Sequence, residues 1–329
     1  MHSARATRIY RAVTHDRAIP APLSMQSDGK DRPGLGIMLM VGFCAIAPLG
    51  DAIAKLLGET VPLLQLLVVR FASQAAVLLP LAWFAGYAFA MTRRVVLLTL
   101  ARTVLHIFGI AAMFTALRFL PLADAVAIAF VMPFIMLLLG RLVLGEEVGI
   151  RRILACIVGF IGTLLVIQPS FANVGAPALL PLAVALIFAL YMLVSRQLAR
   201  DNDPIVLQAV SGVMATAILG VFVLLTRGID YQPIQFVAMS ERDIWLIATI
   251  GVLGTCAHLL MAWSVRFAPS ATLAPMQYLE IPFATLIGWL VFRDLPNGLA
   301  ALGIAITVTS GLYIVWRERR TMRPLPPET

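Results

Sequence analysis

The chain has 329 residues, of which 60% are hydrophobic and 13% are charged, with a mean hydropathy of +0.93 and a formal net charge of +8. A soluble globular protein is about 45–50% apolar and about 25% charged, so this composition excludes an ordinary soluble domain. The positive charge does not require nucleic acid as a partner, because the basic residues are distributed as in a membrane protein.

Ten apolar runs follow one another along the chain. Each run is about 20 residues long, enough to cross about 30 Å of hydrocarbon as a helix. The period-two alternation that is typical of membrane β-barrels is absent. We therefore predict an all-α integral membrane protein with ten transmembrane helices, at about 35–57, 62–84, 95–117, 122–144, 150–168, 177–197, 204–226, 244–266, 270–292 and 298–316.

The polar residues 1–33 precede the first run and predict a cytoplasmic N-terminal tail, and a start codon at Met25 is an alternative. A basic tail, residues 317–329, follows the last run. With the N-terminus in the cytoplasm, the segments on that side hold 18 of the 25 basic residues. This is the positive-inside bias, so we expect a multi-pass protein of the bacterial inner membrane with both termini in the cytoplasm.

The first two runs contain ionisable side chains, which are costly in hydrocarbon and usually face a cavity or a partner. Asp51 lies in the first run, where an ion pair with Lys55 at i+4 is the local alternative. Arg70 lies roughly 12 Å into the second run, and Gln74 lies one turn further along. We expect Asp51, Arg70 and Gln74 to line a substrate pathway, with interhelical pairing that holds the bundle as the alternative.

The third run continues this pattern, because Arg102 and His106 share one helix face at i+4. The ninth run contributes Gln277, Tyr278 and Glu280. Asp51 and Glu280 would balance the charges of Arg70 and Arg102 around a central cavity. The expected pathway residues are therefore Asp51, Arg70, Gln74, Arg102, His106, Gln277, Tyr278 and Glu280.

Proton coupling is a separate question. Glu280 is the first candidate because it is an acid near the expected midplane. His106 and His258 could relay protons, since histidine titrates near neutral pH. A hydrogen-bonded contact between helices is the alternative for both histidines.

Two stretches resemble each other: "ALRFLPLADAVAIAFVMPF" at 116–134 and "SVRFAPSATLAPMQYLEIPF" at 264–283. Arg118 and Pro121 recur 148 residues later as Arg266 and Pro269. Pro133 recurs as Pro282 after a slip of one residue, and both prolines are expected to kink their helices. Asp124 has no acidic counterpart, and no role follows for it from the pattern.

These matches predict a duplicated five-helix unit, at 34–168 and 177–316. A unit with an odd number of spans enters the membrane in opposite orientations in its two copies. The expected architecture is therefore two inverted five-helix repeats, an arrangement that supports alternating access.

The repeated pair, together with "LVLGEE" after the fourth run and "EIPFATLIGWLVF" in the ninth, resembles the EamA-type branch of the drug/metabolite transporter superfamily. In one departure, Arg293-Asp294 stands where the family has glycine-glutamate. The resemblance implies a secondary transporter. The stretches "APLGDAIAKLLGETVPLLQLLVVRF" and "LAPMQYLEIPFATLIGWL", with the helix of Arg102 and His106, are most similar to bacterial riboflavin uptake carriers. Carriers of S-adenosylmethionine are close behind, and amino acids or other metabolites, imported or exported, are further alternatives.

The sequence contains no HExxH, CxxC, G-x-S-x-G or phosphate-binding glycine motif. We therefore expect no catalytic residues, no metal and no cofactor, and an intramembrane enzyme is a remote alternative. The expected partners are a small-molecule substrate and the lipid bilayer, without nucleic acid. A homodimer is left open.

Overall fold

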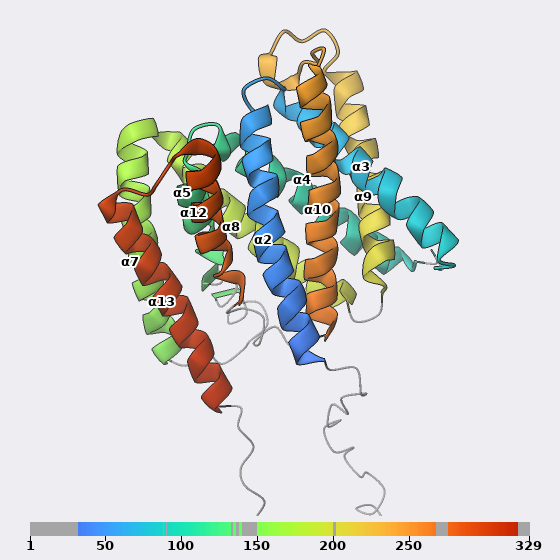
Figure 1. Ribbon diagram of the computed structural model, residues 1–329. Coiled ribbons are helices and arrows are strands. Elements are labelled where there is room, and N and C mark those ends of the chain that lie inside the picture. The colour runs from blue at the N-terminus through green and yellow to red at the C-terminus, as the bar shows by residue number, and fades with distance from the viewer. Residues whose placement is uncertain are drawn as a thin grey trace, which may run out of the picture. The chain divides into compact units, whose positions relative to one another are not determined.

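The computed structural model describes residues 32–87, 89, 91–132, 134–135, 138–139, 150–199, 202–267 and 276–321. Within these residues the chain forms helices and short connections, without strands, so the all-α expectation is confirmed for this part (Figure 1). The α-helices are α2 (Pro33–Leu57), α3 (Leu63–Phe84), α4 (Arg93–Leu117), α5 (Leu122–Ala129), α7 (Ile150–Val174), α8 (Leu180–Ala199), α9 (Pro204–Leu225), α10 (Glu241–Phe267), α12 (Glu280–Phe292) and α13 (Gly298–Thr321). Two 3₁₀ turns, η1 (Ala176–Leu179) and η2 (Gln232–Ile234), precede α8 and α10.

Seven helices of the described part are long and apolar enough to cross a membrane, and they coincide with seven of the ten predicted spans. Of the three other spans, the fourth and the ninth are only partly described. The fourth predicted span is helical as α5, and much of 133–149 lies outside the described residues. The tenth span forms α13, whose apolar part is Gly298–Ser310.

The ninth predicted span differs from the expected single helix. Residues 268–275 lie outside the description, and the chain turns at Tyr278 and Leu279 before α12 begins at Glu280. The structure thus interrupts the predicted ninth helix close to Pro282, where the sequence predicts a kink. Hydropathy did not reveal this break, because the residues on both sides of the turn are apolar enough to read as one run.

Prolines open several helices. Pro62 and Pro121 stand directly before α3 and α5, and Pro204 is the first residue of α9. Proline lacks a backbone N–H, and the first turn of a helix has no intrahelical acceptor for one. The Asp203 carboxylate caps α9 by accepting a hydrogen bond from the Ile205 N–H at 2.9 Å.

The most extensive helix–helix contacts map onto one another when the first five described α-helices (α2, α3, α4, α5, α7) are exchanged for the last five (α8, α9, α10, α12, α13). Helix α2 packs against α10, and correspondingly α4 packs against α8. The α3–α10 contact corresponds to the α4–α9 contact. The α2–α12 contact likewise corresponds to the α5–α8 contact. The pairs α3–α9, α5–α12 and α7–α13 map onto themselves. These contacts are thus symmetric under exchange of the two sets.

The repeated arginines make equivalent contacts in the two sets. Arg118, after α4, donates a hydrogen bond from Nη2 to the Val61 carbonyl oxygen at 3.0 Å. Arg266, near the end of α10, donates from Nη1 to Asp203 Oδ2 at 3.0 Å. Val61 and Asp203 each stand directly before the proline at the start of the neighbouring helix. Each arginine therefore ties the end of the third helix of its set to the start of the second.

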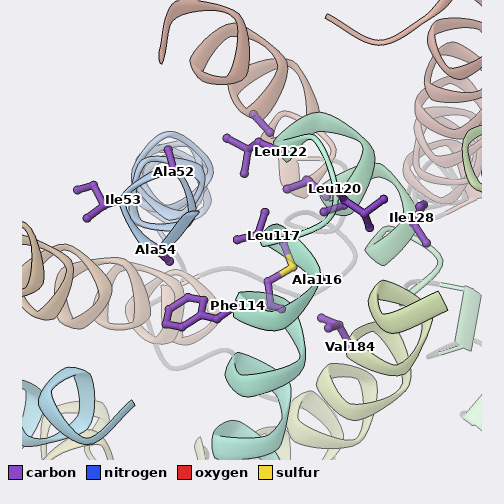
Figure 2. Close-up of a cluster of buried hydrophobic side chains, with 14 of the residues drawn as sticks. Ala52, Ile53, Ala54, Phe114, Ala116, Leu117, Leu120, Leu122, Ile128 and Val184 are labelled. Carbon is purple, nitrogen blue, oxygen red and sulfur yellow. The ribbon is translucent and has the colours of Figure 1, made fainter. Parts of the chain in front are cut away.

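A packed apolar layer lies where α2 and α4 end and α5 begins (Figure 2). Leu57, Leu117, Leu120 and Leu122 have no exposed surface there. In a bilayer such a layer is stabilised by van der Waals packing, because lipid is itself apolar.

Candidate functional site: a central cavity

A cavity of about 160 Å³ lies between the helices, beyond the apolar layer. Its wall contains four phenylalanines and four methionines: Phe43, Phe114, Phe130, Phe188, Met113, Met132, Met192 and Met261. Aromatic rings and thioethers together form an adaptable slot for a flat or irregular apolar ligand. Polar groups reach this wall at five side chains: Asp51, Arg70, His258, Gln277 and Glu280. A mostly apolar wall with a few convergent polar groups is typical of small-molecule sites.

The three charged residues on the wall form one electrostatic group. Asp51 of α2 interacts electrostatically with Arg70 of α3 and with Glu280 at the start of α12. The structure therefore brings together four of the predicted pathway residues: Asp51, Arg70, Gln277 and Glu280.

Arg70 is almost fully buried, with 2% of its surface exposed. It donates a hydrogen bond from Nη1 to Gln74 Oε1 at 3.3 Å. Gln74 in turn donates from Nε2 to the Gln208 carbonyl oxygen of α9 at 2.8 Å. Gln74 thus lies behind Arg70 and positions it, rather than lining the cavity.

Gly254 of α10 faces the Arg70 guanidinium, and sequence reasoning missed it. A Cβ atom at this position would meet Nε, Nη2 and Cζ of Arg70 well inside van der Waals contact. Because Gly254 has no side chain, there is room for the Arg70 guanidinium at this position. Glycine is common enough in membrane helices that its type alone carried no signal.

Arg102 occupies a different environment from the one expected. It donates to Ser195 Oγ at 2.9 Å, to Ser211 Oγ at 2.8 Å and to the Tyr191 hydroxyl. Its guanidinium also lies over the Tyr191 ring, 4.7 Å from the centroid. Hydroxyl groups of α8 and α9, rather than Asp51 or Glu280, are therefore its partners, and Arg102 joins α4 to both helices.

The two histidines meet each other. His106 of α4 and His258 of α10 have their Nε2 atoms 3.1 Å apart, which is hydrogen-bond distance. His258 lines the cavity, whereas His106 lies behind it against Phe71 and Tyr191. Within the described part of the chain, neither Nδ1 atom has a hydrogen-bond partner.

The turn before α12 places the ninth-run residues. Gln277 and Glu280 line the cavity, and the buried Tyr278 packs its ring 5.4 Å from that of Phe130. Pro282 lies in the first turn of α12 rather than in the middle of a long helix. Pro133 lies outside the described residues, so the paired kinks stay a prediction.

Lys55 and Asp124 lie near the apolar layer, away from the cavity. Lys55 donates a hydrogen bond to the Leu120 carbonyl oxygen and lies 5.2 Å from the Phe292 ring centroid. Its charge interacts with Asp294, Asp124 and Glu59, so a local pair with Asp51 is not what the structure favours. Asp124 accepts a hydrogen bond at Oδ2 from Ser170 Oγ at 2.9 Å, which joins α5 to α7.

Among the residues that the structure describes, no three His, Cys, Asp or Glu side chains come together to hold an ion.

Comparisons with known proteins agree with the arrangement. A family model described as the EamA-like transporter family matches residues 34–168 and again residues 176–316. A riboflavin transporter of Rhizobium johnstonii is 30% identical over 224 residues, which are 68% of this chain and 72% of the relative. A riboflavin transporter of Vibrio cholerae is 27% identical over 259 residues, 78% of this chain and 84% of the relative.

An S-adenosylmethionine uptake transporter of Rickettsia prowazekii is 22% identical over 274 residues, 83% of this chain and 90% of the relative. A protein of known crystal structure superposes with a TM-score of 0.61 at 20% identity, covering 86% of this chain and 98% of the other. At that identity the superposition shows a shared fold.

Proposed function

Because the chain belongs to the EamA-like transporter family, we propose that it is a secondary transporter that takes up riboflavin across the bacterial inner membrane. Membership of a transporter family makes it a multi-pass membrane protein that moves a small molecule, and not an enzyme. The riboflavin assignment is carried by one observation above all, the central cavity. Its aromatic and thioether wall suits the flat isoalloxazine ring, and its polar groups suit the imide edge of that ring.

The relatives support the same cargo. The riboflavin transporters are 30% and 27% identical to this chain, against 22% for the S-adenosylmethionine transporter. S-adenosylmethionine is the second candidate, because the carboxylates Asp51 and Glu280 could bind its positively charged sulfonium and amino groups. Arg70 on the same wall offsets one of these two carboxylates and offers hydrogen-bond donors to the carbonyl groups of a flavin.

The proposed architecture is ten transmembrane helices in two inverted repeats, residues 34–168 and 177–316, between cytoplasmic tails at 1–33 and 317–329. The helix contacts that map onto one another when the first five described α-helices are exchanged for the last five support a two-fold relation between the repeats. The equivalent contacts of Arg118 and Arg266 support it as well. Thr60, just after α2, hydrogen-bonds Asp243 at the start of α10, so the end of α10 that carries Arg266 is remote from Arg118. An inverted pair of this kind can open the cavity alternately to either side.

The site residues have two proposed roles. Asp51, Arg70, Gln277 and Glu280 contact the cargo, because they line the cavity. Gln74, Arg102, His106 and Tyr278 position the wall from behind.

Vesicle transport tests the assignment. Purified protein in lipid vesicles should accumulate labelled riboflavin above protein-free vesicles, with unlabelled riboflavin competing. Clear uptake of S-adenosylmethionine or an amino acid, without riboflavin uptake, would reject riboflavin as the cargo.

Replacing Glu280 with glutamine should abolish acceleration of uptake by an imposed proton gradient, whereas riboflavin exchange should remain measurable. The amide keeps the shape of the carboxyl group but cannot carry a proton. Asp124→Asn is the matched control, because that carboxyl is buried and bonded to Ser170 away from the cavity. Equal gradient dependence in Glu280→Gln and the wild type would remove Glu280 from coupling.

A further inference from the structure

The contact between His106 and His258 forms part of the cavity wall. His258 is 8% exposed and lines the cavity, and His106 is 1% exposed directly behind it. Their Nε2 atoms are 3.1 Å apart, and the ring centroids are 4.4 Å apart with the planes at 73°. The contact fixes the His258 ring from its far side.

The hydrogen-bond geometry limits where protons can be. A nitrogen–nitrogen distance of 3.1 Å requires one Nε2 to carry the hydrogen and the other to offer a lone pair. In the neutral pair, the ring that donates has a bare Nδ1, and the ring that accepts has an Nδ1–H. The direction of the internal hydrogen bond therefore decides whether Nδ1 of His258 carries a lone pair or a hydrogen.

Groups of both charges share the cavity wall with His258, namely Arg70, Asp51 and Glu280, whereas Arg102 is bonded to the hydroxyls of Ser195, Ser211 and Tyr191. The charges on the wall therefore do not fix the direction of the hydrogen bond, and a bound cargo can select it. A cargo that offers an N–H to His258 selects the state in which His258 donates through Nε2 to His106 and keeps Nδ1 as an acceptor.

The free Nδ1 atom needs a partner. It is buried and has none among the described residues, and an unsatisfied buried polar atom is costly. We propose that His258 Nδ1 accepts a hydrogen bond from a ring N–H of the cargo, and that His106 is the positioning residue that keeps this nitrogen in its accepting form.

This inference rests on the proposed riboflavin uptake and names its recognition element. The imide N–H of the isoalloxazine ring, between two carbonyl groups, is the matching donor. The carbonyls on either side are acceptors, which Arg70 and Gln277 on the same wall can satisfy.

Binding of two flavins to the purified full-length protein tests the inference by quenching of flavin fluorescence. Wild type should bind riboflavin about five- to tenfold more tightly than N3-methylriboflavin, the analogue without the imide N–H. His258→Phe, which keeps a ring without nitrogen, should lose affinity for riboflavin by a similar factor. It should bind the methylated analogue as the wild type does, so the preference between the two flavins disappears.

The role of His106 is tested by the same difference in affinity between riboflavin and N3-methylriboflavin. His106→Leu removes the acceptor for His258 Nε2 and should reduce discrimination between the flavins, whereas His106→Gln, whose amide oxygen accepts, should restore it. Phe188→Leu, a change of the apolar wall, should weaken both flavins equally and serves as the control.

The outcomes separate the two proposals. If His258→Phe weakens both flavins equally, or neither, His258 is only packing and the inference fails while riboflavin binding stands. If the wild type binds no flavin, riboflavin uptake is rejected, and the proposed imide contact is rejected with it.

Discussion

Gly254→Leu should abolish riboflavin binding and uptake, and Gly254→Ala should reduce affinity at least about tenfold. Even a Cβ atom at this position would overlap the Arg70 guanidinium. The guanidinium is 2% exposed and hydrogen-bonded to Gln74, so it cannot move aside into water. Its displacement would separate its charge from Asp51 and leave both groups poorly compensated in a buried site.

Gly220→Ala is the matched control, because Gly220 is also a helical glycine and nothing lies within 4 Å of a Cβ placed there. It should bind riboflavin normally and gain slightly in stability from the better helix propensity of alanine. Binding is measured by fluorescence titration on protein that elutes as a single folded species in gel filtration. Wild-type affinity in Gly254→Leu would show that the cargo does not need Arg70 where the structure places it.

Hydropathy predicts much of this fold, because lipid requires long apolar segments that satisfy their own backbone hydrogen bonds. Within the described residues it identifies the seven helices that are long and apolar enough to cross a membrane. The repeated Arg-Phe pattern marks the two arginines that the structure shows bonded to the start of a neighbouring helix. Hydropathy does not locate the turn at Tyr278–Leu279. An apolar run shows that a segment is soluble in lipid. Whether the helix breaks there depends on whether the backbone N–H and C=O groups that lose their intrahelical partners find other partners in the folded protein.

The site is predictable in part for a related reason. Charges inside apolar runs are rare and costly, so Asp51, Arg70 and Glu280 stand out in the sequence. The residues that bond to buried charged groups do not stand out in the sequence. Serine and tyrosine are unremarkable in a membrane helix, and only the packing of α4 against α8 and α9 brings such hydroxyls around Arg102. The contact of His106 with His258, 152 residues apart, likewise depends on tertiary structure.

Gly303→Val should destabilise the protein through the contact between α7 and α13, far from the charged cavity wall. A Cβ on Gly303 would overlap the carbonyl oxygen of Gly162, and one on Gly162 would lie 2.8 Å from the carbonyl oxygen of Gly303. Both obstacles are backbone atoms, which cannot rotate away as a side chain can. Close approach through small residues is a main source of helix association in membranes, so forcing the helices apart loses packing along their length.

We expect Gly303→Val to lower the free energy of unfolding by about 2–3 kcal/mol, seen as an earlier midpoint in a denaturation series followed by circular dichroism. Gly298→Ala is the control, because nothing lies within 4 Å of a Cβ at the start of α13. The cavity wall as described is built from other helices than α7 and α13. Protein that remains folded should therefore bind riboflavin with wild-type affinity, which distinguishes this loss of stability from the loss of binding expected for Gly254→Leu. An unchanged midpoint would contradict the close backbone contact, and reduced affinity in the folded fraction would contradict the separation of this contact from the site.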